Sequence, residues 1–390
     1  MLTVLAISNY RSLRKLVVPL EGLNVITGAN GSGKSSLYRA LRLLADTAQG
    51  SVIPSLAREG GLPSTLWAGP PTISRKVRQG EYPVQGTARK GPVNLQLGFA
   101  SDEFSYLIDL GLPPQEKGSP SAFLLDPEVK REVIWQGPIL RPSAVLVDRQ
   151  GPVVRAHTDG GAWNVVASNL LPFDSVMTHI ADPRHAPETL LLRESIRAWR
   201  FYDHFRADVD APARRPQIGT RTPVLSNDGA DVAAAVQTIR EIGDREGLDM
   251  AVADAFPGGV LSVTNAAGRF ELVMEQHGLL RPMSAAEFSD GTLRYLLWIA
   301  ALLTPRPPAL MVLNEPETSL HPDLLAALAR LIAQAAKRSQ IVVVTHSPKL
   351  IAALAEQRGC HSITLQKSFG ETVISGIREV DLPSWHWPGR

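Results

Sequence analysis

The stretch LNVITGANGSGKS, residues 23–35, decides the fold class. Leu23 to Thr27 form a short apolar run rich in β-branched side chains, which predicts a strand. Gly28 to Ser35 follow at once and match the pattern G-x-x-x-x-G-K-[ST] completely. A helix is expected to begin near Lys34, because apolar residues recur at helical spacing after it. A strand, a glycine-rich loop and a helix in this order predict a phosphate-binding loop.

The residue types of this loop suit ATP and Mg²⁺. Glycines let backbone N–H groups close around phosphate oxygens without Cβ clashes, and the helix N-terminus adds partial positive charge. Lys34 is expected to neutralise the β- and γ-phosphates, and the hydroxyl of Ser35 to ligate Mg²⁺. The alternative is a glycine-rich turn that binds nothing. The predicted nucleotide contacts in the loop are Asn30, Gly31, Ser32, Gly33, Lys34, Ser35 and Ser36.

A second apolar strand, Leu310 to Leu313, ends in polar residues. Ligands of doubly wound sheets bind at the carboxyl edge, so Glu315 is the candidate general base for water that attacks the γ-phosphate. Asn314 stands where P-loop enzymes usually place an aspartate that supports the Mg²⁺ shell, and we assign it to the metal site. An amide accepts a hydrogen bond from metal-bound water but brings no negative charge. The alternative for Glu315 is a solvated side chain in a turn.

Two further segments carry candidate site residues. The β-branched strand Ile341 to Val344 is followed by His346, which we expect to reach the γ-phosphate or the attacking water. Ser289 and Gly291 open a long apolar helix, where Ser289 can cap the helix and Gly291 lets the backbone approach a ligand. Beside a phosphate loop, this helix start has a second interpretation as an outward-facing anion site.

Strands and helices alternate at both ends of the chain, which predicts a parallel sheet with helices on its faces. We expect one α/β core with a mixed, mainly parallel sheet, formed by residues 1–50 and 270–390, and an inserted α+β subdomain, residues 51–269. Residues 50–90 are rich in Gly, Pro and Ser and predict loops. About 93–166 predicts antiparallel strands, and about 188–255 predicts helices, one of them from Glu188 to Phe205.

The bulk composition fits a globular chain. Of its 390 residues 44% are hydrophobic, and 40 basic against 38 acidic side chains leave a formal charge of +2. No apolar run approaches the roughly 20 residues that span a bilayer, and no secretory leader is visible, so we expect a cytoplasmic protein without a membrane partner. The single cysteine, Cys360, agrees with a reducing compartment.

Together these motifs resemble the ATPase heads of the ABC superfamily, in the RecF-, SMC- and OLD-like branch that serves DNA repair, chromosome maintenance and phage defence. LNEPETSLHP, residues 313–322, is typical of short stand-alone "predicted ATPase" families of that branch. FSDGTLRY, residues 288–295, looks like a variant of the ABC signature motif, and NYRS, residues 9–12, is similar to the family's opening strand-turn. The resemblance covers roughly residues 1–45 and 285–350.

The resemblance implies an ATPase that closes as a homodimer on ATP binding. Lys34 and Ser35 of one copy would hold the phosphates and Mg²⁺, while Ser289 and Gly291 of the other copy contact the γ-phosphate. It also gives Glu315 the role of base, His346 that of γ-phosphate sensor, and residues 318–321 a place near the dimer interface.

The sequence departs from the family pattern in two ways. Asn314 replaces the usual aspartate, which bears on the rate of hydrolysis more than on ATP binding. The glutamine that relatives use near Mg²⁺ has only two candidates, Gln96 and Gln136. The insert is too short and irregular for SMC arms, and the segment after His346 lacks the acidic clusters of an OLD-type nuclease.

We therefore expect an ATP-driven dimeric switch of RecF/SMC-like type, in DNA maintenance or phage defence, with DNA or a protein effector as candidate partners. The alternatives are an ATP-sensing binding module with little turnover and the nucleotide-binding subunit of a transporter. Two basic groups are candidates for sequence-independent DNA contact, although both are equally typical of solvated loops. They are Arg75, Lys76, Arg78, Arg89 and Lys90, and, in a predicted hinge, Arg214, Arg215 and Arg221.

Overall fold

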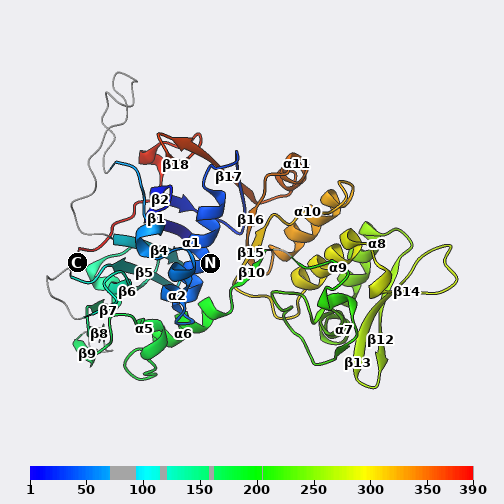
Figure 1. The fold of residues 1–390 in the computed structure, drawn as a ribbon, viewed down its shortest axis with the longest axis horizontal. Helices are drawn as coiled ribbons and strands as arrows, with labels where there is room; N and C mark the ends of the chain where they lie inside the picture. The colour runs from blue at the N-terminus through cyan, green and yellow to red at the C-terminus, as the bar shows by residue number, and fades with distance from the viewer. Residues whose placement is uncertain (71–93, 115–120, 158–161, 204, 390) are drawn as a thin grey trace. The chain divides into compact units, whose positions relative to one another are not determined.

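The computed structural model describes residues 1–70, 94–114, 121–157, 162–203 and 205–389 (Figure 1). Its contacts divide the chain into two units. Unit 1 comprises residues 1–20, 28–198 and 363–390, and unit 2 comprises residues 21–27 and 199–362. The chain passes from unit 2 into unit 1 at Gly28, the first residue of the glycine-rich loop.

Unit 1 contains an eight-stranded antiparallel sheet in the order β2-β1-β4-β5-β6-β7-β8-β9 (Figure 1). The antiparallel strands expected over about 93–166 are confirmed, for example by Leu97 opposite Ile108. The first two strands join this sheet because β1 pairs with β4. The strands are β1 (Leu2–Tyr10), β2 (Leu13–Pro19), β4 (Asn94–Ser101), β5 (Phe104–Gly111), β6 (Glu128–Gln136), β7 (Val145–Gln150), β8 (Val153–His157) and β9 (Trp163–Ala167).

Within its described residues, unit 1 has the helices α1 (Lys34–Thr47), α2 (Val52–Arg58), α3 (Leu62–Thr65), α5 (Val176–His179) and α6 (Pro187–Arg197). Helix α1 begins where expected and buries Leu37 and Leu41. The loop prediction for residues 50–70 is wrong, because α2 buries Val52 and Leu56 at helical spacing and packs on α1. The remainder of that segment, residues 71–93, lies outside the described residues.

Unit 2 is built on a parallel sheet whose strands run β10 (Arg200–Tyr202), β15 (Leu310–Asn314), β16 (Gln340–Val344) and β3 (Leu23–Gly28). The pairing of β3 with β16 confirms that the N-terminal strand shares a sheet with the C-terminal segment. The helix predicted over 188–205 is too long, since α6 ends at Arg197 and β10 follows. Tyr202 is buried and lies opposite Leu313, so tertiary packing overrides helix propensity here.

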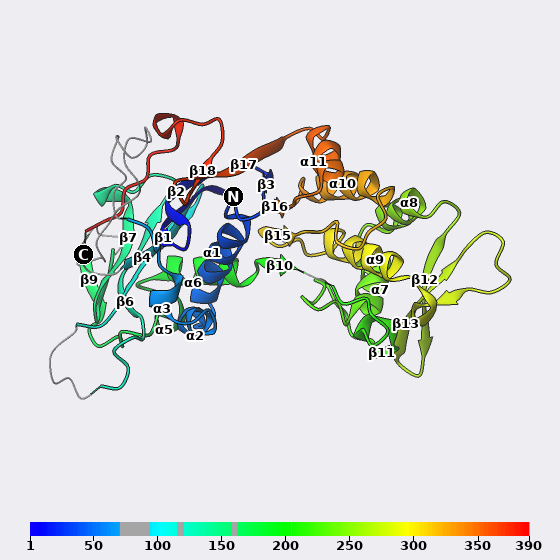
Figure 2. The same ribbon diagram turned by 45° about the horizontal axis from the view of Figure 1, so that its top comes forward.

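Helices α7, α8 and α9 contact one another in unit 2, α10 contacts α8 and α9, and the four helices contribute to a shared apolar cluster (Figure 2). The chain breaks at Gly243 between α7 and α8, because Asp244 caps the second of these helices. These helices are α7 (Val232–Ile242), α8 (Arg245–Ala255), α9 (Asp290–Leu302), α10 (Leu324–Ala335) and α11 (Pro348–Ala355). The antiparallel strands of unit 2 are β11 (Gln217–Ile218), β12 (Val260–Ala266), β13 (Arg269–Glu275) and β14 (Met283–Ser284).

The last two strands, β17 (Cys360–Ser368) and β18 (Glu371–Ile374), form a hairpin, with Leu365 opposite Ile374. Strand β18 contacts β2 in unit 1, and Thr372 donates its backbone N–H to Ser12 at 2.8 Å. None of the helices within the described residues is long and apolar enough to cross a membrane.

Candidate functional site

The glycine-rich loop of unit 1 has the backbone that a phosphate cradle needs. Gly28, Gly31 and Gly33 have φ values of +144°, +76° and +112°, which side-chain-bearing residues rarely adopt. Gly33 caps helix α1, and the first turn of that helix carries no acidic residue. The positive end of a fourteen-residue helix dipole and its free amides therefore remain for an anion.

Lys34 folds back over this loop. Its Nζ donates to the main-chain oxygens of Gly28 at 2.6 Å and Ala29 at 3.2 Å, and the residue is only 7% exposed. The hydroxyl of Ser32 is buried and has no hydrogen-bond partner among the described residues. An orphaned hydroxyl and a cation held by loop carbonyls fit a phosphate group as ligand, because phosphate oxygens accept from both. Ser35 is exposed at the start of α1, where its hydroxyl is available to a metal ion.

The β17–β18 hairpin braces the loop, a role that the sequence patterns did not reveal. Thr372 donates from its hydroxyl to the main-chain oxygen of Ser32 at 2.8 Å and contacts the hydroxyl of Ser12 at 2.9 Å. A Cβ on Gly28 would lie 2.3 Å from the carbonyl oxygen of Leu365, and one on Gly33 would lie 2.2 Å from Oγ1 of Thr372. These glycines are therefore required for packing as well as for their backbone angles.

Glu315 and His346 come together at the carboxyl edge of the parallel sheet in unit 2. Nδ1 of His346 lies 3.1 Å from Oε1 of Glu315, and both side chains are about half exposed. Glu315 has a φ of +49°, a strained left-handed conformation that its backbone bond to Val344, at 2.7 Å, holds in place. Strain at a solvent-facing carboxylate is typical of functional sites, which supports the importance of this residue.

Glu317, which sequence reasoning left without a role, ties the two strand ends together. Its Oε1 accepts hydrogen bonds from the hydroxyl of Thr345 and from the backbone N–H groups of His346 and Ser347, the latter two at 3.2 Å. Its Oε2 is buried and has no hydrogen-bond partner among the described residues. The turn after β15 and the turn after β16 are thus joined through one carboxylate.

Asn314 ends β15 and donates from Nδ2 to Oδ1 of Asp203 at 3.3 Å. Asp203 directly follows β10, whose Tyr202 pairs with Leu313, so the two polar residues end neighbouring strands. Sequence reasoning missed Asp203 because it placed the segment in a helix.

The segment that opens α9 is fixed from inside unit 2. Ser289 caps the helix by accepting from the N–H of Thr292 at 3.1 Å, and its side chain is exposed, as an anion contact requires. Gly291 approaches the turn after β15 closely, since a Cβ there would lie 3.2 Å from the carbonyl oxygen of Ser319. Arg294 donates to the carbonyl of Thr318 at 3.0 Å, and burial lowers the pKa of its guanidinium.

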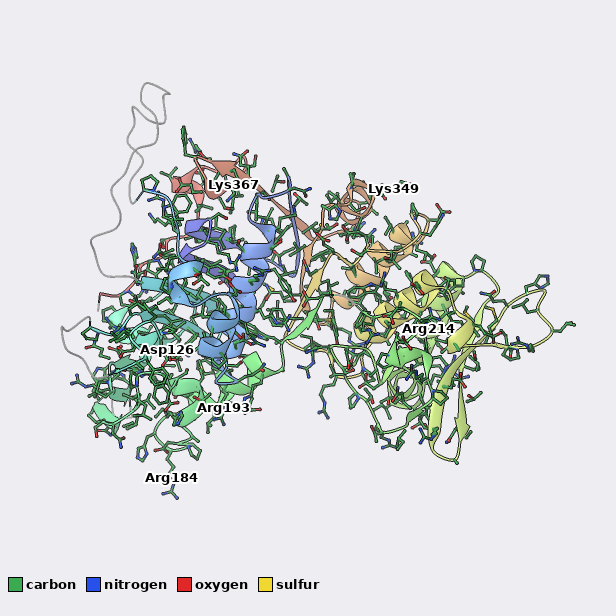
Figure 3. All side chains as sticks on the ribbon, viewed as in Figure 1. Asp126, Arg184, Arg193, Arg214, Lys349 and Lys367 are labelled. Carbon is green, nitrogen blue, oxygen red and sulfur yellow. The ribbon has the colours of Figure 1, made fainter. Side chains whose placement is uncertain are left out.

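Arg214 (labelled in Figure 3) is a structural residue, which corrects its assignment to a DNA-binding patch. It is 7% exposed and donates to the carbonyls of Ala207, Ala285 and Phe288, and to the carboxylate of Asp290 at 2.7 Å. A buried guanidinium that is hydrogen-bonded to these acceptors is not available to DNA phosphates. Of its two predicted companions, Arg215 pairs with Asp210 and Arg221 lies 3.9 Å from Glu241, and both are exposed. The other basic group, at positions 75, 76, 78, 89 and 90, lies outside the described residues.

The two candidate glutamines lie in the antiparallel sheet of unit 1. Gln96 is buried in β4 and donates to Asp109 at 3.2 Å. Gln136 ends β6 and is exposed. The role of a Mg²⁺-proximal glutamine stays a prediction for both.

Comparison with known proteins agrees with this fold. Two family models match: "AAA ATPase domain" over residues 1–99, and "AAA domain, putative AbiEii toxin, Type IV TA system" over residues 169–352. No curated protein matches the sequence. An SMC head bound to the C-terminal winged-helix domain of ScpA is similar over 96% of this chain and 97% of that one, at 14% identity and a TM-score of 0.51.

Two further solved structures are similar at lower scores. The SMC head domain from Thermotoga maritima has 15% identity and a TM-score of 0.42, covering 97% of this chain and 99% of that one. The SMC head with an extended coiled coil from Pyrococcus furiosus, bound to the C-terminal domain of ScpA, has 13% identity and a TM-score of 0.47 over 96% and 95%. With the two family models, the first similarity identifies an ABC/SMC-like P-loop ATPase fold, as the sequence motifs predict.

Proposed function

We propose that this ABC/SMC-like P-loop ATPase binds ATP and Mg²⁺ at the loop of residues 28–35 and hydrolyses the ATP, with Glu315 as general base. The observation that carries the proposal is the contact of 3.1 Å between Glu315 and His346 at the edge where β15 and β16 end. Strand β3, which leads directly into the loop, is the parallel neighbour of β16. Parallel strands bring their carboxyl ends to one edge, where nucleotides of such sheets bind.

Each residue has a distinct part in the proposed reaction. Lys34 and the amides at the start of α1 would bind the phosphates. Ser35 in unit 1 and Asn314 in unit 2 are the residues proposed for Mg²⁺, which would supply positive charge to the phosphates when bound. Glu315 accepts a proton from water as its oxygen attacks the γ-phosphorus, and the bond to the β–γ bridging oxygen breaks to give ADP and phosphate. His346 orients the Glu315 carboxylate through their contact.

We also propose that two copies of the chain close on ATP. Ser289 is exposed at the N-terminus of the thirteen-residue helix α9, where the helix dipole places partial positive charge and Arg214 pairs with the one acidic residue of the first turn, Asp290. Arg214 donates to Asp290 and Arg294 donates to the carbonyl of Thr318, and these bonds fix the start of α9 in one conformation. The segment is therefore preorganised for an anion. The γ-phosphate bound to the loop of a second copy is an anion of the right charge for this surface.

The Glu315→Gln variant tests the proposal. It is expected to bind ATP and to double its mass in light scattering with Mg-ATP, while turnover falls by about 10²–10⁴-fold, the usual contribution of a general base. Glu356→Gln, at the exposed end of α11, is the matched control and should keep wild-type turnover. Lys34→Ala should neither bind nor dimerise. Unchanged turnover in Glu315→Gln would remove Glu315 as base, and a monomer in every condition would remove the dimer.

The pathway belongs to the same proposal. One family model carries the description of a putative toxin of a toxin–antitoxin system, and the similar SMC head was solved with a piece of a partner protein. These descriptions favour an ATP-driven switch that acts on a macromolecular partner, in DNA maintenance or phage defence. Light scattering of the Glu315→Gln protein with Mg-ATP, repeated with duplex DNA at low salt, tests whether DNA is this partner. Binding would raise the measured mass above that of the protein with Mg-ATP alone. An ATP-sensing module with little turnover is the second candidate, because Asn314 brings no charge to the metal site.

A further inference from the structure

The carboxyl edge of the parallel sheet has an unusual distribution of charge. The position at the end of β15, where P-loop enzymes usually carry an aspartate, is the neutral Asn314. Hard divalent cations such as Mg²⁺ prefer carboxylate oxygens or waters that carboxylates hold. A site that lacks this charge would bind Mg²⁺ weakly unless a neighbouring strand supplies it.

Strand β10 provides such a neighbour. It pairs in parallel with β15, so that Tyr202 lies opposite Leu313. Asp203, the first residue after β10, and Asn314, the last residue of β15, come next along the two strands. Nδ2 of Asn314 donates to Oδ1 of Asp203 at 3.3 Å, and both residues are half-buried. Because the two polar atoms of an amide group point apart, this bond turns the carbonyl oxygen of Asn314 away from Asp203.

Two other carboxylates, Glu315 and Glu317, lie at this edge. Glu315 contacts His346 and serves as the proposed base. Glu317 is 8% exposed, and its Oε1 accepts from the turn after β16. Its buried Oε2 has no hydrogen-bond partner among the described residues.

We infer that Asp203 supplies the negative charge of the Mg²⁺ site, and that Asn314, hydrogen-bonded to Asp203, lies between this carboxylate and the metal. This inference rests on the proposed ATP and Mg²⁺ binding. With Mg²⁺ bound, the carbonyl oxygen of Asn314 would be available to metal-bound water, while the Asp203 carboxylate fixes the amide and contributes charge from the neighbouring strand. Asp203 and Asn314 together then perform what one aspartate does in related ATPases, and Asp203 is a positioning residue.

The test measures metal dependence of nucleotide binding, apart from turnover. The full-length chain is titrated with Mg²⁺ in the presence of a fluorescent ATP analogue, and Mn²⁺ binding is followed by electron paramagnetic resonance. Asp203→Asn is expected to raise the Mg²⁺ concentration at half-saturation by about 10–100-fold, as loss of an outer-shell group does. Nucleotide binding in excess EDTA should stay as in the wild type.

Two further variants test whether the position of the carboxylate matters: one moves it from residue 203 to residue 314, and the other is a matched control. Asp203→Asn combined with Asn314→Asp restores one carboxylate and should return the Mg²⁺ midpoint to near the wild-type value. Asp208→Asn changes the same residue type in the same segment, where the carboxylate pairs with Arg206 at 2.8 Å, and should leave the midpoint unchanged. Asn314→Asp alone places two carboxylates at this edge and should lower the thermal midpoint without Mg²⁺ and restore it with Mg²⁺.

The outcomes separate the inference from the function on which it rests. A folded Asp203→Asn protein with an unshifted Mg²⁺ midpoint overturns the inference, and so does an exchange variant that fails to regain Mg²⁺ affinity. Should Asp203→Asn fail to fold, the absence of Mg²⁺-dependent stability in Asn314→Asp overturns it instead. Failure of the proposed function has another signature, since the wild type would then bind no nucleotide or Lys34→Ala would bind as well as the wild type.

Discussion

The hydroxyl of Thr372 donates to the main-chain oxygen of Ser32 at 2.8 Å, across 340 residues of sequence. Because Thr372 is 1% exposed, this bond is shielded from water and joins the β17–β18 hairpin to the phosphate loop within unit 1. The loop conformation therefore depends on a strand near the other end of the chain.

Thr372→Val tests this dependence. It replaces the hydroxyl with a methyl group of similar size and leaves the carbonyl of Ser32 without its donor, so the free energy of unfolding should fall by about 1–3 kcal/mol. ATP affinity, measured by calorimetry, should fall with it because the loop loses its brace. Thr372→Ser retains the hydroxyl and should restore most of the affinity. Equal affinities in the Val and Ser variants would show that the bond does not shape the loop.

Gly33→Ala is expected to disrupt the loop more than Gly31→Ala does. Both positions have positive φ, which costs a side-chain-bearing residue about 1 kcal/mol. At Gly33 the new Cβ would also lie 2.2 Å from Oγ1 of Thr372, whereas at Gly31 no atom lies within 4 Å. ATP affinity should therefore drop more than tenfold in Gly33→Ala and only a few-fold in Gly31→Ala. Similar losses in both variants would contradict a role for the hairpin contact.

The core motifs were predictable because each is local. The strand before the loop, the loop itself and helix α1 have their signals within residues 23–47, and the alternation of strands and helices after Gly291 is equally regular. Glu315 and His346 could be assigned to the same edge of the sheet from the sequence, since each follows a strand of the parallel sheet. Such signals depend on neighbours in sequence, and the structure confirms the elements that carry them.

The supporting contacts were not predictable because they join distant segments. Thr372 lies in an ordinary alternating strand, and nothing in its sequence context indicates that it meets Ser32. Asp203 follows a strand of only three residues, which helical periodicity on its N-terminal side obscured. Arg214 lies among prolines typical of a linker, yet its side chain is buried under the segment that opens α9.

Arg214→Met is expected to destabilise unit 2 strongly. It removes a buried guanidinium and leaves the carbonyls of Ala207 and Phe288 without their donor, which should cost about 1–3 kcal/mol in the free energy of unfolding for each carbonyl. Arg215→Met removes an exposed ion pair with Asp210 and should change it by less than about 1 kcal/mol. Urea denaturation measures both, and comparable effects would refute the buried role of Arg214.

The ion pair between Arg281 and Glu287, in the segment that precedes α9, predicts that the stability of the protein depends on pH. Hydrogen bonds from Arg281, at 2.7 Å and 2.9 Å, lower the pKa of Glu287 from 4.5 to about 2. A depressed folded-state pKa stabilises the protein above the unfolded value, and this contribution is lost as the pH falls from 4.5 toward 2. The difference in urea midpoint between wild type and Glu287→Gln should thus shrink over that range. Arg281→Met should reduce the pH dependence of this difference, while the backbone N–H of Ser284 still donates to Glu287 at 3.0 Å. A difference independent of pH in the wild-type background would exclude the pairing.

Glu317→Ala is expected to affect stability and turnover together. It leaves Thr345 and the N–H groups of His346 and Ser347 without their shared acceptor, which should lower the free energy of unfolding by about 2–4 kcal/mol.

Since these donors hold the turn that carries His346, its contact with Glu315 should loosen and steady-state ATP turnover should fall even where ATP saturates the protein. Glu317→Gln keeps an acceptor oxygen and should lose less of both. Glu356→Ala, at an exposed position, provides the control. If Glu317→Ala lost stability but kept full turnover at temperatures where it is folded, the position of His346 would not limit hydrolysis, and its proposed role beside Glu315 would have to be abandoned.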